Sequence, residues 1–303
     1  MVYRIKKVNH LFADEQRFLK TLCPSYNHYE LKRKCLRYHY TDFKAVKSIL
    51  KNKNVRLMHY MHLNDSKEGK LLFEEIIKQL VDLGELELRD SFENLHKEAV
   101  KNLYLSSLSF FGNLLSQWRG YGYINIGFDI ECLKNNVTMI RDSKGETHIT
   151  SGFEIGSECN YIDFTKEDEN ILVNNIINKF KVSSIPSLED MGTFWHDALA
   201  LGAVLFSTKH IGFWEEREHR IVHYLWGREP FIDNTKDGKK FYIEFDFCAE
   251  AVKRIVVGPS KDQKGLIKNV RNFLKEMGST YEHVQIYQST IPFIDRRNFG
   301  KNF

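Results

Sequence analysis

The stretch STKHIGFWEEREHRIVHY, residues 207–224, combines the alternation of a β-strand with an unusual density of charge. Successive side chains of a strand point to opposite faces, so residues two apart share a face. With this period, one face carries an aromatic ring, two carboxylates and a guanidinium, contributed by Trp214, Glu216, Glu218 and Arg220. The pattern predicts a strand with four functional side chains in one row.

Such a strand is either a solvated edge of a sheet or the floor of a functional site. Aromatic residues precede the charges and apolar residues follow them, which favours the floor of a site. Glu218 and Arg220 can hold each other in place, and this leaves Glu216 free to interact with a cationic centre.

Outward from this stretch, segments with strand and helix patterns interleave along the chain. The helix patterns include 41–54, 64–83, 85–101, 167–181, 192–210 and 261–277, and strand patterns lie between them. Interleaving of this kind predicts one mixed α+β domain over residues 36–303, with a variable insertion near 133–190. Apolar residues at helical spacing predict an N-terminal helical extension over residues 1–35.

Composition sets broad limits on the function. A hydrophobic content of 42% excludes a disordered chain, and 44 basic against 40 acidic residues permit an anionic partner such as a nucleotide without requiring one. The five cysteines form no C-x-x-C pair, and no signal sequence or long apolar window is found. We therefore expect a cytoplasmic protein with no membrane partner.

The segment YHYTDF places His39 and Thr41 at the end of a strand, directly before the start of a helix. Helix starts carry free N–H groups and the positive end of the dipole, which suit a phosphate or a ribose-bearing ligand. The same residues also fit a structural interpretation, in which Thr41 or Asp42 caps the helix and His39 is half-buried. Both interpretations stay open.

The segment from residue 103 to 129 offers a second group of polar and aromatic residues. Ser107 and Ser109 share one face of a predicted strand, and Trp118 and Tyr121 follow it. Aromatic rings beside glycines can form a wall for a planar ligand ring, or they can be ordinary core. The segment lacks the G-x-S-x-G, G-x-G-x-x-G and phosphate-loop patterns, so it gives no support to those chemistries.

A metal centre finds little support in the sequence. The polar cluster Asn64-Asp65-Ser66 closes a predicted strand, but Asp65 lacks the neighbouring carboxylates or histidines of a metal site. No H-E-x-x-H motif is present among the 12 histidines. We expect no catalytic metal, although a metal-dependent nuclease using Asp65 and the acidic strand is retained as an alternative.

Several of these motifs together resemble the bacterial domain-of-unknown-function family numbered 2971. The resemblance covers roughly residues 36–263 and rests on segments that occur in the family's order: YHY at 38–40, ND at 64–65, the block 107–128, E-x-E-x-R at 216–220 and VVG at 256–258. Two positions depart from the family pattern, because Ser66 stands where proline is usual and the tryptophan lies one place closer to the acids.

The segment YHYTDFKAVKSILKNKNVRL, residues 38–57, is more distantly similar to the opening motif of ADP-ribosyltransferase folds. This resemblance implies a split, curved sheet and NAD as the substrate. It implies that His39 and Thr41 bind ribose, that Ser107, Ser109, Trp118 or Tyr121 contacts nicotinamide, and that Glu216 or Glu218 is the catalytic carboxylate, oriented by Arg220. A carboxylate near the positive charge that develops on ribose lowers the barrier electrostatically.

The resemblance thus implies an enzyme that transfers ADP-ribose from NAD to a macromolecular target, either nucleic acid or protein, or that hydrolyses NAD. A bacterial toxin-like or phage-defence effector is the setting suggested by the same analogy. The alternative from another class is a non-catalytic ligand-sensing or protein-interaction module, in which E-x-E-x-R is a structural ladder. The sequence leaves the oligomeric state open.

Overall fold

The computed structural model describes residues 36–63, 69–135, 139–145, 147–149, 155–162, 167–182, 201–202, 204–225, 227–236 and 238–292. Four predicted features lie wholly or partly outside these ranges: the extension 1–35, the cluster 64–66, the insertion near 133–190 and the helix 192–210. The chain from residue 37 onward forms one unit that contains both helices and strands. The prediction of a mixed α+β class is confirmed.

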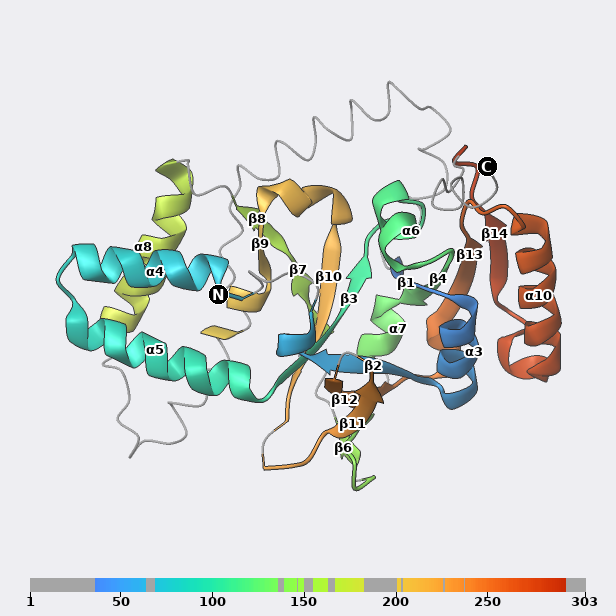
Figure 1. Cartoon of the computed structure of the whole chain (residues 1–303), viewed down its shortest axis with the longest axis horizontal. Helices are drawn as coiled ribbons and strands as arrows, with labels where there is room; N and C mark the ends of the chain where they lie inside the picture. Colours follow the sequence, from blue (N-terminus) through green and yellow to red (C-terminus); the bar gives the residue numbers. More distant parts are fainter. Residues whose placement is uncertain are drawn as a thin grey trace. The chain divides into compact units, whose positions relative to one another are not determined.

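A mostly antiparallel sheet organises the described residues (Figure 1). Its main path runs β14-β13-β4-β1-β3-β2-β12-β5-β6, while β10 pairs with β3 and β7, and β11 pairs with β12. The strands are β1 (Leu36–Thr41), β2 (Asn54–His59), β3 (Leu103–Ser109), β4 (Ile124–Asp129), β5 (Met139–Arg141), β6 (Thr147–Ile149), β7 (Ile155–Glu158), β10 (Glu218–Tyr224), β11 (Phe231–Thr235), β12 (Gly238–Asp246), β13 (Val252–Val257) and β14 (Gln285–Gln288). Two further strands, β8 (Asn160–Ile162) and β9 (Thr208–His210), form a separate parallel pair.

The sheet divides at β3. One edge of β3 pairs with β10 along its whole length, from Leu103 to Ser109. The other edge is shared, because β1 pairs at Ser109 and β2 pairs at Tyr104 and Leu105. Strand β3 therefore brings β1 and β10, which are far apart in the sequence, to its two sides.

The helices of the described residues are of two kinds, α-helices and short 3-10 helices. The α-helices are α3 (Phe43–Asn52), α4 (Leu71–Asp82), α5 (Leu86–Lys101), α6 (Leu115–Tyr121), α7 (Ile130–Asn135), α8 (Glu167–Val182) and α10 (Gln263–Glu276). The 3-10 helices are η2 (Tyr60–His62), η3 (Ile211–Glu216), η4 (Ala249–Ala251) and η5 (Gly278–Tyr281). None of these described helices is long and apolar enough to cross a membrane.

Helix α3 shows how local sequence sets the boundaries of an element. The Asp42 side chain accepts a hydrogen bond from the backbone N–H of Ala45 at 2.8 Å, so Asp42 rather than Thr41 caps the helix. Val46 and Leu50, four residues apart, form the buried face. The helix ends where Lys53 adopts a left-handed conformation with φ of 53°.

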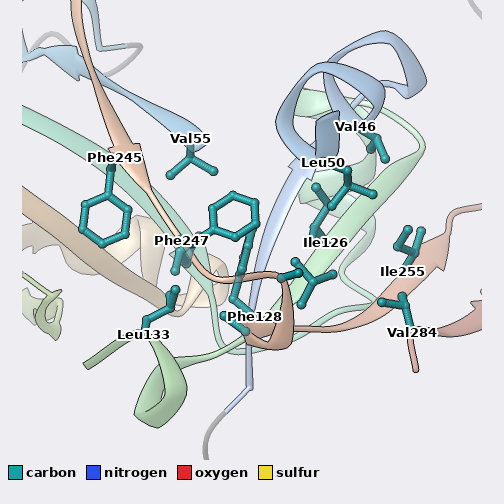
Figure 2. Close-up of a cluster of buried hydrophobic side chains, with 14 of the residues drawn as sticks. Val46, Leu50, Val55, Ile126, Phe128, Leu133, Phe245, Phe247, Ile255 and Val284 are labelled. Carbon is teal, nitrogen blue, oxygen red and sulfur yellow. The ribbon is translucent and has the colours of Figure 1, made fainter. Parts of the chain in front are cut away.

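Two hydrophobic clusters pack against opposite faces of β3. Tyr104 and Leu108 belong to the first cluster, and Leu103 and Leu105 belong to the second. Since alternate residues of a strand face opposite sides, the clusters lie on different faces. The first includes residues of α3, β2, β4, α7, β12 and β13, whose side chains point toward one another in Figure 2. The second is formed with α4, α5 and α8, of which α4 contacts both other helices (Figure 1).

Candidate functional site

The structure corrects the strand predicted through Trp214 and Glu216. Residues Ile211–Glu216 form the 3-10 helix η3, whose first turn is capped by the His210 Nδ1, which accepts from the Gly212 N–H at 3.0 Å. Arg217 then adopts a left-handed conformation with φ of 46°, and β10 begins only at Glu218. A two-residue period cannot run through a helical turn. Trp214 is therefore not in one row with the glutamates and is 45% exposed.

Glu216 and Glu218 nevertheless meet, because both bind Lys209. The Lys209 Nζ lies 2.7 Å from the Glu216 Oε2 and 3.3 Å from the Glu218 Oε1. The side chains of Lys209 and Glu218 are 5% and 7% exposed, while that of Glu216 is 17% exposed. The sequence leaves Glu216 free to interact with a cationic centre, and in the structure the cation that it binds is Lys209, on the short strand β9.

Arg220 pairs with Glu218, as the sequence predicted. The Arg220 Nε and Nη2 donate to the same carboxylate oxygen of Glu218 at 3.0 and 2.8 Å, and Nη1 donates to the Phe206 carbonyl. The Arg220 side chain is 1% exposed. We call Lys209, Glu216, Glu218 and Arg220 the β10 charge cluster. It contains two cations and two carboxylates, so its formal charges balance.

The two predicted serines lie against this cluster. Strand pairing places Ser109 opposite Glu218 and Ser107 opposite Arg220, so all four side chains lie on one face of the sheet. The Ser107 Oγ donates to the Glu218 carboxylate at 3.3 Å, and the Ser109 Oγ donates to the Glu216 carbonyl at 2.8 Å. Four predicted site residues are thus brought together by two neighbouring strands.

Two further contacts come from the segment around β8, and sequence reasoning did not identify them. The backbone N–H of Glu218 donates to the Tyr161 hydroxyl at 2.8 Å. The Cys159 thiol lies 3.8 Å from the Glu218 carboxylate, and burial raises the pKa of this thiol well above its usual value. The residues are more than fifty positions from Glu218 in the chain, so no local pattern connects them to it.

Burial dominates the electrostatics of the β10 charge cluster. Desolvation raises the pKa of Glu218 to about 7, and the neighbouring Lys209 ammonium opposes this rise. The pKa of Lys209 lies above its usual value, because attraction to Glu218 and Glu216 outweighs the burial that would lower it. A proton can therefore be taken up at Glu218 near neutral pH, while Lys209 stays charged.

His39 is not brought to this cluster. Strand pairing aligns Tyr38 with Ser109, and Ser109 with Glu218, so Tyr38 shares their face. His39 is the next residue along β1, and its side chain therefore points to the opposite face. His39 is half-buried, and burial lowers its pKa, which favours the neutral imidazole. Thr41 shares the face of His39 by the same alternation.

Trp118 and Tyr121 do not form a common wall. Trp118 is 0% exposed, its Nε1 donates to the Asn113 side chain at 3.2 Å, and its ring lies edge-on to Tyr40 with centroids 4.5 Å apart. Gly258 packs directly on the same ring, since a Cβ placed there would lie 2.7 Å from it. Trp118 is therefore a core residue, whereas Tyr121 is 42% exposed at the end of α6.

The described residues contain no group of three or more histidine, cysteine, aspartate or glutamate side chains able to hold a metal ion. Asp65, the residue on which the nuclease alternative depended, lies outside the described residues. A comparison with known proteins gave no matching family model, no matching curated protein and no matching solved structure.

Proposed function

We propose that this chain cleaves NAD and transfers ADP-ribose to a macromolecule or to water, with Glu216 as the catalytic carboxylate. The observation that carries the proposal is the pairing of β3 with β10. This pairing gathers Ser107, Ser109, Glu218 and Arg220 on one face, and Lys209 joins Glu216 to them. The role implied by the resemblance thus falls on residues that share one site.

The reaction needs a negative charge beside the ribose. The bond between ribose C1′ and the nicotinamide nitrogen breaks, nicotinamide leaves with the bonding electrons, and positive charge develops on the ribosyl group. A preorganised carboxylate stabilises that charge, and the acceptor then bonds to C1′ and loses its proton. Glu216 suits this role better than Glu218, because its side chain is more exposed and lies at the end of η3.

The other residues of the β10 charge cluster act as positioning groups in this proposal. Arg220 and Lys209 fix the Glu218 carboxylate, and Lys209 in turn fixes the carboxylate of Glu216. Rigid placement of a charged group is what makes electrostatic stabilisation effective in a transition state. His39 and Trp118 are left out of the site, since they lie on another face and in the core.

Two exposed aromatic residues lie two and three positions before Glu216 and offer a surface for a planar ring. Phe213 and Trp214 are 38% and 45% exposed, and the Lys209 Nζ lies 4.9 Å from the Phe213 ring centroid. Aromatic faces of this size stack on heterocycles such as nicotinamide or adenine. They take the stacking role that the resemblance assigned to Trp118 or Tyr121.

Incubation of the full chain with NAD labelled in its adenylate half tests the proposal. We expect nicotinamide release, with label found on an offered protein or RNA acceptor or as free ADP-ribose. Glu216→Gln is expected to lower the release rate about 100-fold or more. Glu215→Gln is the matched control, because Glu215 is the exposed neighbour on η3. Folded wild-type protein that releases no nicotinamide with either acceptor would contradict the proposal.

A non-catalytic ligand-binding or interaction module is the second candidate function. The observation that favours it is the ion pairing of both glutamates, which is also expected of a purely structural ladder. This candidate predicts NAD binding without turnover, or no NAD binding at all, and equal behaviour of the Glu216→Gln and Glu215→Gln variants. Equilibrium dialysis with labelled NAD beside the release assay separates the two functions.

A further inference from the structure

Arg254, on β13, is a buried cation at the other end of the sheet from β10. It is 7% exposed, its Nη1 donates to the Tyr38 hydroxyl at 3.1 Å, and its guanidinium lies 4.2 Å from the centroid of the Tyr287 ring. Its Nε is buried and has no hydrogen-bond partner. In the part of the chain that the structure describes, Arg254 forms no ion pair with a carboxylate.

Two other arginines, Arg220 and Arg56, are paired with a carboxylate of the chain itself and serve for comparison. Arg220 is as buried as Arg254, and Glu218 pairs with it at 2.8 Å. Arg56 lies over a tyrosine ring as Arg254 does, 4.0 Å from the Tyr242 centroid, but it is half exposed and pairs with Asp233 at 2.9 Å. Arg254 alone of the three is buried without a carboxylate.

Buried charges in proteins are paired with an opposite charge, because leaving one unpaired away from water is strongly unfavourable. The Nε donor of Arg254 is unused, and the edge of a guanidinium that carries Nε presents two parallel donors to two oxygens of one anion. We propose that Arg254 is the centre of a binding site for an oxyanion of the phosphate type.

On one side, Arg254 borders the strand β14. Its neighbours there are Tyr287, which is half-buried, and Gln285, which is exposed, and the pairing of β13 with β14 sets Gln285 beside Arg254. Strand β14 is the end strand of the described sheet. Gly127 on β4 pairs with Arg254. Because Gly127 has no side chain, the Tyr38 ring and Arg254 can occupy the space beside it; a Cβ at this position would lie 2.9 Å from the Tyr38 ring.

This site is separate from the β10 charge cluster. Tyr38 lies between them, since it pairs with Ser109, the partner of Glu218, and its hydroxyl accepts from Arg254. The backbone of Gly112 packs directly on the Tyr38 ring, where a Cβ would lie 2.5 Å from it. The two sites are thus divided by packed chain. The inference about Arg254 therefore holds or fails independently of the proposed reaction on NAD.

Equilibrium dialysis of the full chain with radiolabelled inorganic phosphate, pyrophosphate or ADP tests the site. We expect one equivalent to bind saturably, and we expect Arg254→Met to weaken binding at least tenfold while Arg56→Met leaves it unchanged. Binding of ADP alone would identify the phosphate of a nucleotide as the source, and binding of all three would identify a site for free phosphate as well. Absence of saturable binding to wild-type protein overturns the proposal.

Equal binding by wild type and Arg254→Met also overturns it. Circular dichroism and the thermal midpoint without phosphate establish that the variant is folded. If Arg254→Met does not fold, Arg254→Lys serves instead: it keeps the charge but loses the paired donors of the guanidinium, so weaker binding supports the site and unchanged binding contradicts it.

A second inference rests on an unrelated observation, the contact between Cys132 on α7 and Cys248 before η4. Their sulfur atoms lie 3.6 Å apart, neither cysteine forms a disulfide, and both side chains are partly exposed. A disulfide needs sulfur atoms about 2 Å apart, so a small side-chain adjustment brings them within bonding distance. We infer that this pair is a site of reversible oxidation by hydrogen peroxide.

The two thiols have different roles in the oxidation by peroxide. Burial and the neighbouring Cys248 raise the pKa of Cys132 to about 11, so Cys132 is a poor first nucleophile. The Cys248 thiolate attacks peroxide and becomes a sulfenic acid with release of hydroxide. Cys132 then gives up its proton and attacks the Cys248 sulfur, which forms the S–S bond and releases water. Two thiols and one peroxide give one disulfide and two waters.

Peptide mapping by mass spectrometry after mild peroxide treatment tests this pair. We expect a Cys132–Cys248 linked peptide, two hydrogens lighter than its reduced parts, which dithiothreitol separates again. Cys132→Ser and Cys248→Ser each abolish it, and Cys248→Ser also protects Cys132 from oxidation. Failure to detect the linked peptide, or oxidation of Cys132 alone to sulfinic acid, contradicts the inference.

Discussion

Buried positive charge is compensated in different ways in two regions of the sheet, around β10 and around β13. At β10, Arg220 and Lys209 are buried together with two carboxylates from the same short segment of chain. At β13, Arg254 is buried with a tyrosine hydroxyl and a tyrosine ring but with no carboxylate among the described residues. The first arrangement is complete within the chain, and the second is complete only with an anion from outside.

The largest loss of stability is expected when the charge balance of the β10 charge cluster is disturbed. Arg220→Met leaves the buried Glu218 with one cation fewer, and we expect a loss of about 3–5 kcal/mol in the free energy of unfolding at pH 8. Urea denaturation measures it. At pH 6 the loss is expected to be smaller, because Glu218 can take up a proton there. The exposed ion pair of Arg56 with Asp233 is the control, because Arg56→Met is expected to change the free energy of unfolding by about 1 kcal/mol or less.

A somewhat smaller effect is expected from pH alone. The pKa of Glu218 rises from 4.5 to about 7 on folding, so between these values the folded chain binds more protons than the unfolded chain. Stability contributed by this group is therefore present at low pH and is lost as the pH rises through about 7, by an amount on the order of 3 kcal/mol. Urea denaturation from pH 5 to 8 measures the slope, and Glu218→Gln should flatten it. An unchanged slope in that variant would show that Glu218 is ionised throughout.

A smaller loss of stability is expected when a neutral hydrogen-bond partner of Glu218 is removed. Ser107→Ala deletes the hydroxyl that donates to Glu218 and is expected to lower the free energy of unfolding by about 1 kcal/mol. Ser106, the next residue, is buried on the opposite face of β3 and makes the matched control. A loss for Ser106→Ala as large as that for Ser107→Ala would mean that the hydrogen bond to Glu218 contributes nothing specific.

The smallest effect is expected at the other end of the sheet. Arg254→Met removes a buried charge that lacks a carboxylate and keeps most of the packing, so in phosphate-free buffer we expect a change within about 1 kcal/mol, or a gain in stability. Thermal unfolding of both proteins tests this. A loss comparable to that of Arg220→Met would mean that the surrounding chain already compensates the Arg254 charge, and it would remove the contrast between the two ends.

Much of the fold could be predicted from the sequence, because it depends on local patterns. The α+β class follows from interleaved periodicities, the start of α3 from a cap at Thr41 or Asp42, and the pair Glu218–Arg220 from a two-residue spacing within one strand. The two serines were singled out on one strand face and do lie on the face of Glu218.

The rest of the site depended on contacts between distant segments. Lys209 lies within the quoted stretch, but only the turn of η3 and the left-handed Arg217 bring it to Glu216. Tyr161 and Cys159 reach Glu218 from β8 and the residue before it, and no spacing in the sequence indicates this. The resemblance to ADP-ribosyltransferase folds assigned His39 to the same site, whereas strand register decides which face His39 occupies. Register is a long-range property, and a shift by one residue reverses every side chain.

We propose that Glu216 acts on the ribose and that Glu218 holds the site together. The most direct test is to measure, at pH 8, both nicotinamide release from NAD and the unfolding midpoint of Glu216→Gln and Glu218→Gln. We expect Glu216→Gln to unfold like the wild type but to release nicotinamide about 100-fold more slowly or not at all. We expect Glu218→Gln to shift the unfolding midpoint and to keep measurable release. Wild-type release rates in Glu216→Gln, or no release from the wild type itself, would contradict it.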